Sequence, residues 1–172
     1  MLGKDYPGQQ CALARSLEVV GERWTLLILR DAFYGVRRFS DFATHLEIPR
    51  AVLSDRLRGL VDDGLLERRR RDAGPAGPDV YELTDHGRAL WPALFALMRW
   101  GQGLDGAPQP SRRFLHAACD SPLDDRGICP RCGVAPKPQD ILTVVPDGPS
   151  HRSGPVHQAL QPARHLLDPL VI

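Results

Sequence analysis

The sequence has no apolar run that approaches the roughly 18 residues needed to cross a bilayer. Its first residues, Met1 to Asp5, contain no apolar stretch of the kind found in secretion signals. These two absences predict a cytoplasmic protein with no membrane partner. Aromatic residues are also few, at 6% of the chain, whereas 16 glycines and 16 prolines indicate that part of it is rich in loops.

The patterns of common enzyme sites are missing as well. There is no phosphate-binding loop, no pair of catalytic carboxylates, and no thioredoxin-type strand pattern around the one C-x-x-C pair, Cys129 and Cys132. We therefore expect that the protein is not an enzyme. A thiol oxidoreductase using this pair is the alternative, which a dithiol turnover assay would test.

Lysine is absent from residues 37–71, although nine arginines and six acidic residues lie there and the whole chain has a formal net charge of only +1. Arginine is the residue best suited to forked contacts with phosphate and guanine. The local excess of positive charge therefore favours a nucleic acid partner. A solvated edge of the protein is the alternative interpretation.

Apolar residues at helical spacing predict four helices before residue 65 and a longer one later in the chain. They are expected over residues 9–20, over 22–34, from Ser40 as N-cap to Leu46, from Pro49 to the residue before Gly64, and from Thr84 as N-cap to about Trp100. In the fourth helix, Leu53, Leu57 and Leu60 form an apolar stripe that predicts one buried and one exposed face.

Two short strands are expected between the fourth and fifth helices, at 65–71 and 80–83. The segment between them, Asp72 to Asp79, is dense in turn-forming residues, so the pair predicts a β-hairpin. Because side chains of a strand alternate between faces, four consecutive arginines place charge on both faces. We therefore expect the end of this hairpin to project from the domain.

Short helices followed by a projecting basic hairpin predict a winged helix-turn-helix, a mainly α fold with a small β wing (α+β). The exposed side of the fourth helix would enter the major groove of double-stranded DNA, and the hairpin would contact the backbone or the minor groove. The predicted DNA-contacting residues are Arg37, Arg38, Arg50, Ala51, Ser54, Asp55, Arg56, Arg58, Arg69 and Arg71. For Arg56, a structural ion pair with Asp55, Asp63 or Glu67 is an equal alternative.

Residues 9–101 resemble an HxlR-type transcriptional regulator. The resemblance rests on these motifs in this order: Cys11, Gly21-x-x-Trp24, Arg38-Phe39-Ser40, Leu53-Ser54-Asp55-Arg56-Leu57, Asp63-Gly64-Leu65 and Tyr81-Glu82-Leu83-Thr84-x-x-Gly87. It implies a homodimeric repressor or activator whose helix-turn-helix pair is Asp41 to Leu46 and Pro49 to Asp62. Pro49 departs from the pattern, because family members usually carry a capping Ser there, and the wing tip at 74–78 is longer than usual.

A homodimer also agrees with the apolar pattern of the predicted last helix. Its apolar residues cover more than half of the circumference, so one part can pack on its own domain while the surplus needs a second partner. Those residues are Leu90, Trp91, Leu94, Phe95, Leu97 and Met98. The resemblance likewise implies dimers that join mainly through the first and last helices.

The segment at 114–148 contains three of the four cysteines. His116-x2-Cys119-x9-Cys129-x2-Cys132 has the residue types and spacing of a Cys3His structural zinc site, and metal binding would help to fold a segment poor in apolar residues. A disulfide switch between Cys119 and the Cys129–Cys132 pair, a redox pair, or a reduced loop without metal are the alternatives.

Cys11 lies near the start of the first predicted helix, where the helix N-terminus lowers a thiol's pKa. In some HxlR-type regulators a cysteine at this position senses oxidants or electrophiles, so the resemblance implies a sensing role. A small buried residue at the dimer interface is the alternative.

Four parts are expected along the chain: a DNA-binding and dimerisation domain at 9–101, a linker at 102–113, a zinc-ribbon-like segment at 114–148 and a tail at 149–172 that is either helical or disordered. The predicted function is a homodimeric, sequence-specific transcriptional regulator responding to oxidants through Cys11 or to a small apolar ligand between the long helices. The alternative is a zinc-ribbon interaction module that uses the winged domain for protein contacts.

Overall fold

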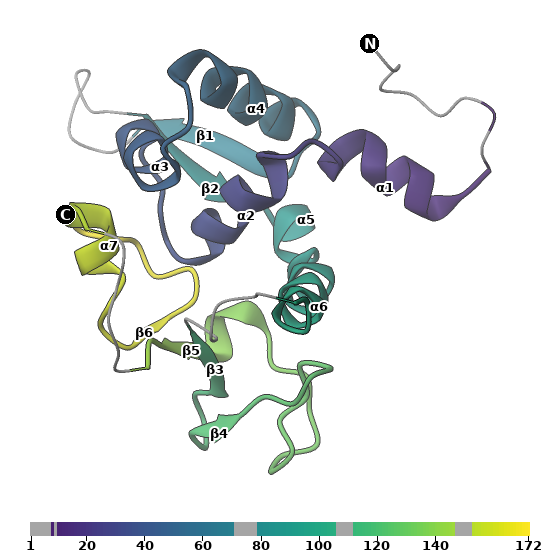
Figure 1. Cartoon of the computed structure of the whole chain (residues 1–172), viewed down its shortest axis with the longest axis vertical. Helices are drawn as coiled ribbons and strands as arrows, with labels where there is room; N and C mark the ends of the chain where they lie inside the picture. Colours follow the sequence, from purple (N-terminus) through teal and green to yellow (C-terminus); the bar gives the residue numbers. More distant parts are fainter. Residues whose placement is uncertain (1–7, 9, 71–78, 106–111, 147–152) are drawn as a thin grey trace.

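The computed structural model describes residues 8, 10–70, 79–105, 112–146 and 153–172 (Figure 1). It is a helix-rich α+β protein with a small β-hairpin, as the sequence predicts. The N-terminal helices are α1 (Ala12–Val20), α2 (Thr25–Phe33), α3 (Phe39–Leu46) and α4 (Arg50–Asp62). None of the described helices is long and apolar enough to cross a membrane.

The helix-turn-helix core forms where the apolar stripe predicts it. Leu53, Leu57 and Leu60 of α4 are buried against Ile28 and Phe33 of α2 and their neighbours in a single cluster. Each of these leucines is about one turn from the next, so all three lie on one side of α4 and burying them leaves the other side in solvent. The predicted cap at Ser40 is wrong, because the N-cap is Arg38 and α3 begins at Phe39, two residues earlier than a cap at Ser40 would give.

Strands β1 (Leu66–Arg70) and β2 (Asp79–Leu83) form the predicted antiparallel hairpin, with Leu66 opposite Leu83 and Arg70 opposite Asp79. At its base, both leucines are buried in the core. The predicted turn at 72–79 falls almost wholly on residues outside those described. The prediction that the end of the hairpin projects from the domain is therefore not tested.

The long helix predicted from Thr84 to Trp100 consists of two helices, α5 (Asp85–Arg88) and α6 (Trp91–Gln102). Pro92 explains the break. It lacks an amide hydrogen, and in a continuous helix its ring would collide with the carbonyl of Arg88, four residues earlier. Thr84 caps α5 as predicted, since its Oγ1 accepts a hydrogen bond from Gly87 N at 3.0 Å.

The C-terminal part of the chain forms a second sheet, of strand order β4-β3-β5-β6. Its elements are β3 (Arg113–His116), β4 (Ser121–Pro122), the 3-10 helix η1 (Pro138–Asp140), β5 (Ile141–Val144), α7 (Pro155–Ala159) and β6 (Arg164–His165). All strand pairs are antiparallel, including β5 with β6. Arg164 and His165 therefore add an edge strand to the sheet of the Cys-rich segment.

Both parts of the chain share one core. Phe114 of β3 packs its ring against Trp91 and Phe95 of α6, with centroids 5.4 and 5.5 Å apart. Ile141, Leu160 and Leu166 are buried in the same cluster as α2. The boundary predicted at 101 thus separates two sequence segments that pack together.

The last residues also bond to the turn after α2. Leu167 N donates to Phe33 O and Leu170 N donates to Gly35 O, each at 2.8 Å. Gly35 has a φ of +88°, and a side chain there would overlap the Asp168 carbonyl. A glycine at 35 is therefore needed both for the turn and for the close approach of the C-terminal segment.

Candidate nucleic-acid interface and metal centre

The outer face of α4 is open to solvent. Arg50, Ala51, Ser54, Asp55 and Arg58 are all exposed, and all five belong to the predicted DNA-contacting set. They alternate with the buried leucines along the helix. The face therefore presents two cations, a hydroxyl, a carboxylate and a methyl group, side chains that can reach base edges and phosphates.

The start of α4 is fixed without a side-chain cap. Pro49 occupies the N-cap position with an extended backbone, and its carbonyl accepts a hydrogen bond from Leu53 N at 2.9 Å. The guanidinium of Arg50 lies 5.9 Å from the centre of the Phe39 ring. This cation–π contact holds Arg50 beside the first turn of α3, so the starts of α3 and α4 lie next to each other.

Arg37 and Arg56, also in the predicted set, have protein partners. Arg37 forms an ion pair with Glu82 of β2 and donates to Leu167 O at 3.1 Å. Arg56 lies 3.4 Å from Glu22 and 3.6 Å from Asp55. Of the acidic partners considered for Arg56 in the sequence, Asp55 is present in the structure, whereas Glu22 was not anticipated.

The wing arginines are exposed on β1 and flanked by carboxylates. Arg68 Nε donates to Asp79 at 2.9 Å, and Arg69 pairs with Glu67 at 2.6 Å. Arg70 is exposed at the end of the strand, and Arg71 lies outside the described residues. Because two of these arginines have carboxylate neighbours, part of the local positive charge is already balanced. Counting charges over residues 37–71 of the sequence could not show which arginines are balanced in this way.

A buried carboxylate that the sequence analysis missed connects α2 to α3. Asp31 is fully buried; it accepts hydrogen bonds from Arg30 at 2.8 and 3.0 Å, and its other oxygen lies 2.6 Å from His45 Nδ1. A buried charge is stable only when paired in this way. An aspartate in the apolar stripe of α2 was the available signal, since such a position predicts a partner on the next helix.

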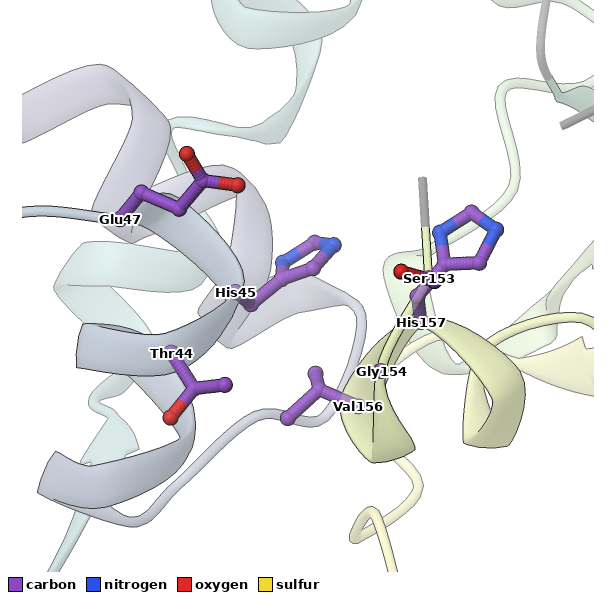
Figure 2. A pocket seen from close by; sticks show the side chains of 7 residues that line it. All are labelled: Thr44, His45, Glu47, Ser153, Gly154, Val156 and His157. Carbon is purple, nitrogen blue, oxygen red and sulfur yellow. The ribbon is translucent and has the colours of Figure 1, made fainter. Parts of the chain in front are cut away.

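A cleft of about 130 Å³ opens between α3 and α7 (Figure 2). Its lining is mostly polar and comprises Thr44, His45, Glu47, Ser153, Gly154, Val156 and His157. Its small size and polar lining do not suit an apolar effector, and it lies away from the long helices between which such a ligand was expected.

The four predicted metal ligands converge. Nitrogen and sulfur atoms of His116, Cys119, Cys129 and Cys132 all lie within 4.8 Å of one another, and none of the three cysteines is in a disulfide. Cys119 Sγ lies 3.5 Å from the sulfurs of both Cys129 and Cys132, and 3.6 Å from His116 Nδ1. These separations are far longer than the ~2.05 Å of a disulfide and close to the edges of a tetrahedron around one ion with bonds of about 2.3 Å to sulfur.

The backbone preorganises this cluster. His116 O accepts from Cys119 N at 3.1 Å, while Cys129 N donates to Val134 O and Gly133 N donates to Cys129 O, each at 2.8 Å. Burial alone would raise the pKa of the Cys129 thiol, but backbone and side-chain hydrogen bonds, among them those of Cys132 and His116, lower this pKa to about 6. A thiolate is the form that binds metal, so the cluster could bind a metal ion.

Comparison with known proteins decides the family. A family model described as HxlR-like helix-turn-helix matches residues 19–107, which is more than half of the chain. The chain belongs to the HxlR family. It is a transcriptional regulator with a helix-turn-helix DNA-binding domain, and not an enzyme.

Two relatives support the HxlR assignment over much of their length. Rv3095 of Mycobacterium tuberculosis, an uncharacterized HTH-type transcriptional regulator, is 47% identical over 123 residues, covering 71% of this chain and 77% of its own. YdeP of Bacillus subtilis, of the same description, is 31% identical over 106 residues, or 59% and 81% of the two chains. Since the Rv3095 match is longer than 107 residues, it extends past the end of the HxlR-like domain.

Solved structures show the same fold. The crystal structure of PA1607 superposes with a TM-score of 0.61 at 37% identity and covers 69% of this chain and 82% of that one. The redox regulator HypR in its reduced form superposes with a TM-score of 0.50 at 28% identity, covering 54% and 91%.

The cysteine that precedes the first helix is exposed. Cys11 is the N-cap of α1, which projects from the rest of the molecule (Figure 1). Backbone amides of Ala14 and Leu13 at the helix start lower the pKa of the Cys11 thiol. Within the monomer Cys11 is therefore not a buried packing residue, and its thiolate is favoured by its position.

Large apolar side chains are exposed on α1 and on α6. On α1 these are Leu13, 66% exposed, and Leu17; on and just after α6 they are Leu97, Trp100, 67% exposed, and Leu104. Exposed side chains of this size, gathered on two helices, mark a surface that needs a partner.

Proposed function

We propose that this HxlR-family regulator acts in the cytoplasm as a homodimer that binds a pseudo-palindromic DNA operator in a sequence-specific manner. The two copies of α4 would enter major grooves about one helical turn apart, and the two wings would contact the flanking backbone. The dimer interface would be formed by the exposed apolar residues of α1 and α6.

One observation carries this proposal: the outer face of α4 is exposed although residues 112–146 and 153–172 pack against the same domain. Those residues pack on α2, α3 and α6 instead, through contacts such as the bond from Leu167 N to Phe33 O. Had they covered α4, DNA could not reach the five exposed side chains.

The DNA contacts divide by chemistry. Arg50, Ala51, Ser54 and Asp55 would contact base edges, because they lie in the first half of the exposed face. The more distant Arg58 and the flanking Arg38, Arg69 and Arg71 would contact phosphates. Arg37 and Arg56 are assigned to structural ion pairs, since their guanidinium groups already lie against carboxylates.

A pair of substitutions tests this division. An operator is first selected from a random duplex library with the full chain. Ser54→Ala is expected to change the preferred sequence, at a cost of about 1–3 kcal/mol at the affected base pair. Arg58→Ala should instead weaken binding to all duplexes alike and reduce the salt dependence by about one unit of slope. Binding that shows no salt dependence would overturn the proposed function and favour a protein partner.

We propose oxidants or electrophiles as the signal, sensed at Cys11. Its exposure and lowered pKa support this role, and so does the likeness to HypR, a redox regulator. The alternative of a small apolar effector finds no support in the polar cleft between α3 and α7.

We also propose that the ion held by His116, Cys119, Cys129 and Cys132 is structural zinc. Three thiolates and one imidazole in a closed tetrahedral arrangement are the ligand set that zinc prefers for structural sites. Native mass spectrometry of the purified chain should show one zinc ion per subunit. A mass equal to that of the metal-free chain, with all four thiols reduced, would exclude the site.

A further inference from the structure

The two halves of the metal cluster are the two ends of one loop. His116 and Cys119 precede this loop, which we call the docking loop (residues 120–128), and Cys129 and Cys132 follow it. Asp124 braces its middle, because Oδ1 accepts hydrogen bonds from Arg126 N at 2.9 Å and Ile128 N at 2.8 Å. An ion bound by Cys119 and Cys129 would close the loop at its base and lower the entropic cost of ordering it.

The middle of the docking loop lies against α6. Arg99 Nε of α6 donates to Asp125 Oδ1 at 2.9 Å. Gly127, with a φ of +77°, approaches so closely that a Cβ there would lie 3.3 Å from the Phe95 ring. The loop therefore contacts α6 through a charged hydrogen bond and through van der Waals contact with a buried ring.

The same helix carries the exposed apolar residues. Phe95 and Arg99 lie one turn apart on the side of α6 that faces the loop, whereas Leu97 and Trp100 are exposed. The docking loop therefore contacts the same helix that presents the exposed apolar residues.

We infer that metal binding at the cluster controls dimerisation, and through it operator affinity, by closing the docking loop against α6. The inference rests on the proposed homodimer and on the proposed metal ion, and it adds the physical link between them. Loss of the ion frees both ends of the loop, the contacts of Asp125 and Gly127 weaken, and α6 no longer presents its apolar side in one orientation.

The first test removes one exposed ligand from the full chain. Cys132→Ser is expected to lower the zinc content well below one ion per subunit in native mass spectrometry. In analytical ultracentrifugation its dimer dissociation constant should rise about tenfold, the range usual for coupled sites. Operator affinity should fall in parallel, and raising the protein concentration should restore binding.

The second test breaks the link and leaves the ligands intact, so that it remains informative if Cys132→Ser fails to fold. Asp125→Ala should keep one zinc ion per subunit yet weaken the dimer several-fold. Arg126→Ala is the matched control, because this neighbouring side chain is exposed and pairs with Asp124 of the same loop, so the change should leave both zinc content and the dimer unchanged.

The failures of the three proposals are distinguishable. If both variants dimerise as tightly as the unaltered chain, the link through α6 is wrong, while the DNA-binding function stands. If the unaltered chain binds no zinc, the metal proposal falls and the inference falls with it. If the unaltered chain contains zinc and dimerises but binds no duplex, the proposed function fails independently of the link.

Discussion

Arg37 and Arg58 belong to the same arginine-rich window, but their surroundings differ. Arg58 is exposed on α4, whereas Arg37 joins Glu82 of the wing to the Leu167 carbonyl. Counting charges in the sequence cannot separate the two, because an ion pair formed across 45 residues leaves no local pattern.

We expect Arg37→Ala to lower the free energy of unfolding by about 1–2 kcal/mol, because the partly buried carboxylate of Glu82 and the carbonyl of Leu167 lose a charged hydrogen-bond donor. Denaturant unfolding followed by circular dichroism measures this change, with Arg58→Ala as the control expected to be neutral. Equal stability of the two variants would return Arg37 to the DNA-contacting set.

At Cys11 the expected behaviour concerns reactivity. The helix start lowers the pKa of the Cys11 thiol. At any pH below the usual pKa of a cysteine, a larger fraction of Cys11 is therefore thiolate in the folded chain than in the urea-unfolded chain. Alkylation of Cys11 should accordingly begin at a lower pH in the folded chain. Peptide mass spectrometry after a pulse of iodoacetamide gives the rate at each pH.

The same residue gives a functional test. Cys11→Ser should bind operator normally but remain bound after mild treatment with hydrogen peroxide, whereas the unaltered chain should be released. Release of both proteins at the same peroxide concentration would eliminate Cys11 as the sensor and direct attention to the three clustered cysteines.

At the scale of elements, the sequence predicts best what is periodic. The helices α2 and α4 and the hairpin were predictable because their apolar residues repeat at helical spacing or their ends carry turn-forming residues. The break between α5 and α6 could also have been predicted from Pro92. The convergence of His116, Cys119, Cys129 and Cys132 was predictable from their spacing, since a short C-x-x-C turn limits where its side chains can point.

The docking of the C-terminal segment was not predictable. Its contacts with α2 are backbone hydrogen bonds, such as those of Leu167 and Leu170, and backbone groups leave no trace in side-chain patterns. The sequence predicts a tail at 149–172 that is either helical or disordered, whereas the structure has a short helix, α7, that ends at Ala159 and is followed by strand β6.

Gly35 gives this docking a test. Gly35→Ala should destabilise the protein by more than about 1 kcal/mol, because the φ of +88° is unfavourable and the new methyl group would displace the Asp168 carbonyl. Gly59→Ala on α4 is the control, since a methyl group there meets open space; it should raise stability by about 0.4–1 kcal/mol. Thermal unfolding of both variants decides the matter, and a neutral Gly35→Ala would mean that residues 167–170 do not lie against this turn in solution.

For the whole molecule, the exposed side chains of α1 and α6 matter most. The double substitution Leu13→Glu with Trp100→Glu should give a folded monomer, because both side chains are about two-thirds exposed and contribute little to the core. Buried against a second copy, two carboxylates per subunit would cost far more than the dimer can offset. Size-exclusion chromatography with light scattering should show the monomer mass, and a persistent dimer would place the interface elsewhere.

The bonds from residues 167 and 170 to residues 33 and 35 join the C-terminal segment to a turn that comes much earlier in the sequence. A ribosome makes the helix-turn-helix before it makes the strands and leucines that close over α2. During synthesis the apolar side of α2 therefore stays uncovered until the C-terminal segment has also been translated. A truncation that removes residues 153–172 would leave the apolar side of α2 exposed to solvent, and we expect such fragments to bind chaperones or to be degraded.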